Sequence, residues 1–103
     1  MDKVKVTGIK MPRPCKRRRI RGRPASDYFK PAGIQLRDLE DVELSLAEFE
    51  AIRLVDLNQT PQSQAAEDMN ISQPTLSRIL STGRNKVADA LINGKAIRIK
   101  PDN

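Results

Sequence analysis

The side chains best suited to recognition chemistry in this 103-residue sequence are four polar residues that lie close together in its second half. They are Gln73, Thr75, Ser77 and Arg78. In the major groove of DNA, glutamine can pair with adenine, arginine can pair with guanine, and the methyl group of threonine can contact thymine. If residues 73–80 form a helix with Leu76 and Leu80 on its buried side, these four side chains are exposed. The spacing therefore predicts a helix that contacts base edges.

Residues 61–80 supply the elements that would position this helix. They read PQSQAAEDMNISQPTLSRIL, which predicts a short helix, a tight turn and a second helix, the parts of a helix-turn-helix. Pro61 suits the first position of a helix that runs to about Met69. Asn70 can adopt the left-handed conformation that the turn requires, and Ser72 can cap the second helix. A structural helical hairpin and a protein-binding helical module are the alternatives for the same pattern.

Small and apolar residues predict how these two helices pack. Ala66 is small enough for a close crossing, while Met69, Ile71 and Leu76 would fill the wedge between the helices. The expected buried face of the second helix comprises Leu76, Ile79, Leu80, Val87, Ala88, Leu91 and Ile92. This helix is expected to reach about Asn93, with a bend or interruption at Gly83.

Capping residues and apolar spacing indicate the remaining elements. Ser45 and Glu48 form a capping box, and apolar residues then recur at the helical period as far as Leu57, so we expect a helix over 46–57. A short helix or turn is expected before it, from the spacing of Leu36, Leu39 and Val42. Gly94 is placed to end the long helix, and the alternating sequence AIRIK that soon follows predicts a short terminal strand.

Basic residues are concentrated in the first third of the chain. Residues 1–31 carry eleven Lys and Arg against two acids, whereas residues 32–57 carry two against seven, and the whole chain has a formal net charge of +6. Five of the six residues 16–21 are basic, and the Pro and Gly residues around them exclude a long helix. Such a segment suits contacts with phosphates or with the minor groove. The candidate phosphate-contacting residues are Lys16, Arg17, Arg18, Arg19, Arg21, Arg23, Arg84 and Lys86.

This charge distribution divides the chain into three parts. They are an N-terminal extension (1–10), a basic arm with an aromatic anchor (11–35) and a helical DNA-binding domain (36–100). Tyr28 and Phe29 are expected to hold the basic arm against the body. Two alternatives to DNA contact apply to the arm: pairing with acidic residues of the same fold or of a second chain, and a role in solubility alone.

The composition leaves little for enzymatic or metal chemistry. The chain has no His and one Cys, Cys15, which excludes imidazole catalysis, an internal disulfide and a cysteine metal cluster. Glu48 and Glu50 lie two residues apart and do not face each other on a helix, so we interpret them as solvated or as partners of the arm. No apolar run reaches the roughly 20 residues of a membrane span, and no signal-type segment follows Met1. We expect a cytoplasmic protein without a membrane segment that is not an enzyme and holds no cofactor or metal.

Four ordered blocks of sequence carry a resemblance to a known family. They read PRPCKRRRI, YFKPAGIQLRDLEDVELSLAEFEAIRLVDL, QAAEDMNISQPTLSRIL and KVADALINGKAIRI. Over about residues 11–100 the chain resembles the uncharacterised prokaryotic family 0251, also called domain of unknown function 134. The resemblance implies a DNA-binding protein with a helix-turn-helix similar to region 4 of bacterial sigma factors. Asn70 stands where that turn usually has Gly, and Arg21 and Gly22 stand where some relatives have cysteines, so no metal site is carried over.

Together these features predict a mostly α fold, a sigma region 4-like helix-turn-helix with a basic N-terminal arm and short flanking strands. The expected function is sequence-specific binding of double-stranded DNA in transcriptional regulation. The alternatives are a protein-interaction module that docks on the transcription machinery through the acidic helix 46–57, and a nonspecific nucleic-acid binder that acts through the arm. Because helix-turn-helix proteins that read palindromes are commonly dimers, a homodimer is also expected.

Overall fold

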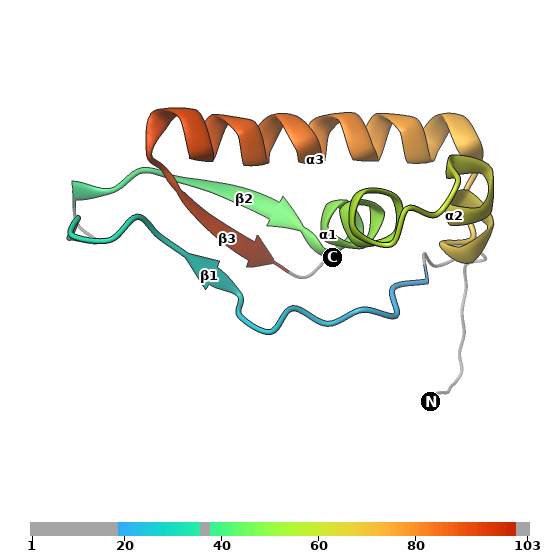
Figure 1. Cartoon of the computed structure of the whole chain (residues 1–103), viewed down its shortest axis with the longest axis horizontal. Helices are drawn as coiled ribbons and strands as arrows, with labels where there is room; N and C mark the ends of the chain where they lie inside the picture. The colour runs from blue at the N-terminus through green and yellow to red at the C-terminus, as the bar shows by residue number, and fades with distance from the viewer. Residues whose placement is uncertain (1–18, 36–37, 101–103) are drawn as a thin grey trace, which may run out of the picture.

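The computed structural model describes residues 19–35 and 38–100, which form three α-helices and a small three-stranded sheet (Figure 1). In chain order the elements are β1 (Tyr28–Phe29), β2 (Asp41–Ser45), α1 (Leu46–Ile52), the π-helical turn η2 (Arg53–Leu57), α2 (Gln62–Asp68), α3 (Gln73–Asn93) and β3 (Ala96–Lys100). The long helix α3 covers the sheet with its C-terminal half and packs on α1 and α2 with its N-terminal half (Figure 1). The fold is therefore mixed α/β with a helical majority. The extension over residues 1–10 lies outside the described residues.

Strand β3 is the centre of the sheet and pairs with both other strands. Strand β1 runs antiparallel to it, with Tyr28 opposite Arg98, and β2 runs parallel to it, with Leu44 opposite Ile99. Parallel neighbours require a long crossover, and the helices between residues 46 and 95 supply it. The terminal strand expected from the alternation of AIRIK is confirmed.

Strand β2 corrects one expectation from the sequence. The short helix or turn expected from the spacing of Leu36, Leu39 and Val42 is wrong at Val42, which lies in the strand opposite Ile97. A turn does precede the strand, since the backbone N–H of Asp38 donates a hydrogen bond of 3.0 Å to the carbonyl of Gln35. Residues 41–45 read DVELS, in which apolar and polar side chains alternate, and Leu44 is buried. Pairing with a strand far along the chain decides the conformation here, as is common for short strands.

Local capping residues set the helix boundaries as expected. The Ser45 side chain accepts a hydrogen bond from the backbone N–H of Glu48, and the Glu48 carboxylate accepts one from the backbone N–H of Ser45, which completes the capping box. Ser72 caps α3, and Gly94 ends it in the left-handed conformation with φ 68°. Asn70 has φ 60°, which confirms the turn expected between α2 and α3. The expected helix 46–57 is realised by α1 and η2 together.

Helix α3 runs through Gly83 without interruption, contrary to the expected bend. Gly83 is buried where α3 crosses α1, and a Cβ there would lie 3.1 Å from Cβ of Glu48 and 3.2 Å from Cδ1 of Ile52. The glycine therefore permits the close approach of the two helices, and the packing keeps this residue helical.

Apolar side chains near the ends of two helical segments are exposed. Ala88 is exposed, and Leu91 and Ile92 are 76% and 81% exposed, so the expected buried face of α3 is wrong at these three positions. Leu57, at the end of η2, is 75% exposed. Ala90 is 4% exposed in the same turn of α3, so the sheet covers a different face of this helix from the one that carries Leu91 and Ile92.

The main core lies where α1, η2, α2 and α3 meet. It comprises Ala47, Ala51, Leu54, Ala65, Ala66, Met69, Leu76 and Leu80. Ala66, Met69 and Leu76 are buried and Ile71 packs against them, which confirms the expected wedge between α2 and α3. Half of this core is alanine, so the helix backbones approach closely and α2 is held firmly against the start of α3.

Candidate nucleic-acid interface

The first two turns of α3 present most of the predicted base-contacting side chains to the outside. Gln73, Ser77 and Arg78 are exposed, because Leu76 and Leu80 occupy the buried side of the helix. Thr75 is half-buried, and its hydroxyl accepts a hydrogen bond of 2.8 Å from the Ser72 hydroxyl. Its side chain therefore takes part in the cap of α3, while its methyl group remains able to contact a base.

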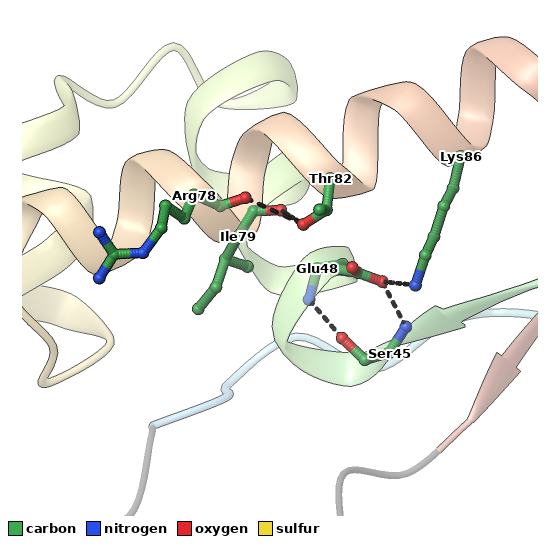
Figure 2. A network of polar contacts seen from close by, with 6 residues as sticks. All are labelled: Ser45, Glu48, Arg78, Ile79, Thr82 and Lys86. Carbon is green, nitrogen blue, oxygen red and sulfur yellow. Dashed lines mark hydrogen bonds and ion pairs between the residues drawn. The ribbon is translucent and has the colours of Figure 1, made fainter.

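Arg78 extends from α3 without a partner in the described part of the chain. Its side chain forms no ion pair or hydrogen bond there, and Figure 2 shows its guanidinium pointing away from Glu48 and Lys86. Thr82 donates hydrogen bonds to the carbonyl groups of Arg78 and Ile79 at 2.9 and 3.1 Å. The guanidinium keeps all its donors available for an external acceptor.

The basic arm passes the turn between α2 and α3. The backbone N–H of Arg19 donates a hydrogen bond of 3.0 Å to the carbonyl of Met69. The chain then runs from the α2 end of the molecule to β1 (Figure 1). An open groove at the turn is lined by Arg19, Glu67, Asp68, Asn70, Ile71 and Ser72. Arg19 is thus placed beside the start of α3, whereas Lys16, Arg17 and Arg18 lie outside the described residues.

Glu50 holds the arm to the body through a contact that we name the Glu50 clamp: Glu50, Arg53 and the backbone amides of Arg21 and Gly22. Glu50 is 1% exposed. Its carboxylate accepts hydrogen bonds from the backbone N–H groups of Arg21 at 3.1 Å and Gly22 at 3.2 Å, and from Nε and Nη2 of Arg53 at 2.7 and 2.8 Å. The interpretation of Glu50 as a partner of the arm is confirmed, whereas its interpretation as a solvated residue is wrong.

These hydrogen bonds keep Glu50 charged in spite of its burial. Burial raises the pKa of Glu50, but the hydrogen bonds from Arg53, Arg21 and Gly22 together outweigh it, so the pKa lies below its ordinary value of 4.5. The pKa of Arg53 is raised by its hydrogen bonds to Glu50. The clamp is therefore an ion pair that also satisfies two backbone amides of the arm.

Glu48 forms a second buried contact, between α1 and α3. Its Oε1 accepts a hydrogen bond of 2.9 Å from Nζ of Lys86 while it also caps α1 (Figure 2). Burial raises the pKa of Glu48, but the hydrogen bonds from the Ser45 backbone and from Lys86 outweigh it, so the pKa is lowered. Glu48 is 7% exposed, so the reading of this carboxylate as solvated is also wrong.

Apart from Lys30, whose Nζ donates hydrogen bonds to the carbonyl groups of Pro31 and Ile34, the basic side chains of residues 19–35 and 38–100 fall into two groups. Those in ion pairs are Arg53, Arg84, Lys86, Lys95, Arg98 and Lys100. Those with neither an ion pair nor a side-chain hydrogen bond are Arg19, Arg21, Arg23 and Arg78. Every member of the second group lies on the arm or on the first two turns of α3.

Two predicted phosphate contacts are already engaged within the chain. Nη2 of Arg84 lies 2.6 Å from Oδ1 of Asp56, and Lys86 pairs with Glu48 as described. The hydrogen bonds between Arg84 and Asp56 raise the pKa of the arginine and lower that of the aspartate. Arg84 and Lys86 thus offer less unneutralised charge than the arm does.

Neither a metal site nor a membrane span is found in the described residues. Residues 19–35 and 38–100 contain no group of three or more His, Cys, Asp or Glu that could hold a metal ion. Within the same ranges, no helix combines the length and apolar character needed to cross a bilayer.

The fold and this surface define a small α/β domain whose basic N-terminal segment lies against a pair of helices. The chain belongs to the family described as "Protein of unknown function DUF134", which matches residues 9–103, and the resemblance seen in the sequence is confirmed. It is 58% identical over 90 residues to a UPF0251 protein of Dehalococcoides mccartyi, covering 87% of this chain and 77% of that protein. It is 52% identical over 93 residues to a UPF0251 protein of Caldanaerobacter subterraneus, covering 90% and 79%. No solved structure matches the chain.

Proposed function

We propose that this chain is a sequence-specific DNA-binding protein that acts in transcriptional regulation in the cytoplasm. In this proposal α2 and α3 form a helix-turn-helix similar to region 4 of sigma factors. The first two turns of α3 enter the major groove of double-stranded DNA, with Gln73, Ser77 and Arg78 facing the base edges. The methyl group of Thr75 adds an apolar contact.

One observation carries this proposal: the location of the unpaired arginines. The arginines without an internal partner, Arg19, Arg21, Arg23 and Arg78, lie on the arm and at the start of α3. An unpaired arginine can pair with a guanine or a phosphate without first breaking an ion pair. This distribution favours the binding of a polyanion at the end of the molecule where α2 and α3 meet.

The carboxylates of the segment 46–57 make the protein-docking alternative weaker. Glu48, Glu50 and Asp56 each pair with a basic residue of the same chain. A partner that recognised this segment by its negative charge would have to compete with those internal pairs. We therefore favour DNA over the transcription machinery as the partner.

Selection of binding sites from random duplex DNA tests the proposal. We expect one sequence motif to be enriched at fixed salt, with specific binding at least a thousandfold tighter than nonspecific binding. A palindromic motif, together with a sedimenting dimer, would support a homodimer. Equal affinity for all sequences with a steep salt dependence would instead indicate a nonspecific binder that acts through the arm. Absence of duplex binding at any salt would rule out both.

A further inference from the structure

We propose that Glu50 is a positioning residue that holds the basic arm against the α2–α3 turn, so that the arm and the start of α3 act as one DNA-binding surface. This inference rests on the proposed function. The Glu50 carboxylate is buried and cannot touch DNA itself. In this proposal it determines where the positive charge of the arm is presented.

The geometry of the Glu50 clamp supports a dedicated role. Glu50 lies on α1, yet it accepts hydrogen bonds from the backbone of Arg21 and Gly22, 29 and 28 residues earlier in the chain. Its contacts are with backbone amides, so the arginine side chain of Arg21 is left exposed and unpaired. The carboxylate therefore fixes the path of the arm without neutralising the charge that the arm carries.

A second contact lies close to the clamp along the chain. The backbone N–H of Arg19 donates to the carbonyl of Met69, the residue at the C-terminal cap of α2. Between Arg19 and Gly22 the arm is thus tied at one end to the α2–α3 turn and at the other to α1. Because Met69 is fully buried in the core, the arm has a fixed position relative to the first turns of α3.

Gly22 fits this clamp because it lacks a side chain. A Cβ at this position would overlap the Nε and Cδ atoms of Arg53, which lies across the glycine while it pairs with Glu50. The arm and Arg53 therefore share the carboxylate of Glu50 only while residue 22 is small. This gives a way to disturb the clamp from the side of the arm, without changing the core.

The experiment compares Glu50→Gln with Glu43→Gln in the full chain. Both changes remove one negative charge, but Glu43 is an exposed residue of β2 that pairs with Lys100 and takes no part in the Glu50 clamp. General electrostatics would strengthen DNA binding in both variants, because each loses a negative charge. We expect Glu50→Gln instead to weaken binding and to lower the slope of log affinity against log salt by about two, since each lost phosphate contact removes about 0.9.

Hydrogen exchange tests the clamp without DNA. The amides of Arg21 and Gly22 should exchange about tenfold faster or more in Glu50→Gln, because a hydrogen bond to a charged group is lost, and should be unchanged in Glu43→Gln. Gly22→Ala disturbs the Glu50 clamp independently, in case Glu50→Gln fails to fold. It should also lower the slope of log affinity against log salt.

A variant that lacks the basic candidate phosphate contacts of the arm separates positioning from a general effect on the fold. Its substitutions are Lys16→Gln, Arg17→Gln, Arg18→Gln, Arg19→Gln, Arg21→Gln and Arg23→Gln. In this background Glu50→Gln should not change the salt slope further. A further loss of the same size, or a Glu50→Gln slope equal to that of Glu43→Gln, would overturn the positioning role alone. If the unmodified protein binds no duplex DNA, the proposed function fails as well.

Discussion

Lys86 and Glu48 join α3 to α1 through an ion pair of 2.9 Å (Figure 2). The same distance separates Lys100 from Glu43 across β3 and β2. The two pairs differ in burial. The carboxylate side chain is 10% exposed in the first pair and 57% exposed in the second. The structure thus contains two lysine–glutamate pairs of equal length in different surroundings, which makes them a natural comparison.

Lys86→Met should lower the free energy of unfolding by about 1–3 kcal/mol, because it leaves the buried Glu48 carboxylate without a cation. Lys100→Met should change it by less than about 1 kcal/mol, since exposed ion pairs contribute little. Chemical denaturation of both variants measures the difference. Equal effects would mean that burial of Glu48 does not determine the strength of its pair with Lys86.

Gly83→Val should destabilise the domain by about 1–3 kcal/mol through overpacking against α1. Ser81→Val, an exposed position on the same helix, is the matched control, because both variants place a β-branched residue in α3. Thermal melts of the two proteins check the prediction. A midpoint for Gly83→Val that is not below that of Ser81→Val would contradict the close crossing of α3 and α1 at this point.

Acid should destabilise the fold, with Glu48 and Glu50 contributing in the same direction. Their pKa values are lowered in the folded chain, so the folded state binds protons less readily than the unfolded state. The stabilisation is therefore present above the ordinary value of 4.5 and is lost as the pH falls through the lower folded-state values. Unfolding midpoints between pH 7 and pH 3 should fall in the unmodified protein. They should fall less in Glu50→Gln. A steeper fall in that variant would show that Glu50 is not a source of the acid-sensitive stability.

Elements defined by neighbouring residues could be predicted from the sequence, whereas elements defined by distant partners could not. Ser45 with Glu48, and Gly94 at the end of α3, act over a single turn, so their spacing alone predicts the boundaries. Strand β2 has only Val42 and Leu44 as its apolar pattern, and its hydrogen bonds come from β3 at the other end of the domain. A five-residue segment with so short a pattern is decided by tertiary pairing.

The candidate site shows the same division. The exposure of Gln73, Ser77 and Arg78 follows from the helical period of α3, and this could be predicted. In the Glu50 clamp, Glu50 binds backbone amides that lie 29 and 28 positions earlier in the chain, those of Arg21 and Gly22. Backbone amides carry no sequence signature. The three-residue spacing of Glu50 and Arg53 was the available signal, although such a pair is usually a feature of an exposed helix face.

Arg78 and Arg84 lie on the same helix, but only Arg84 has an ion-pair partner in the described residues. Arg78→Ala should weaken specific DNA binding by about 1–3 kcal/mol and relax the preference at one base position, as expected for an arginine that pairs with guanine. Arg84→Ala should have a smaller effect on affinity, because Arg84 is already paired with Asp56, and the loss of that exposed pair should cost at most about 1 kcal/mol of stability.

Binding selections and salt titrations of the two variants provide the measurement. Uniform weakening of Arg78→Ala on every sequence, with a salt slope lower by about 0.9, would show that Arg78 contacts phosphate and not a base. A stronger loss of specificity in Arg84→Ala than in Arg78→Ala would place the base contacts about 1.7 turns further along α3. In that case Gln73 and Ser77 would lie outside the major groove, and the proposed orientation of α3 would be wrong.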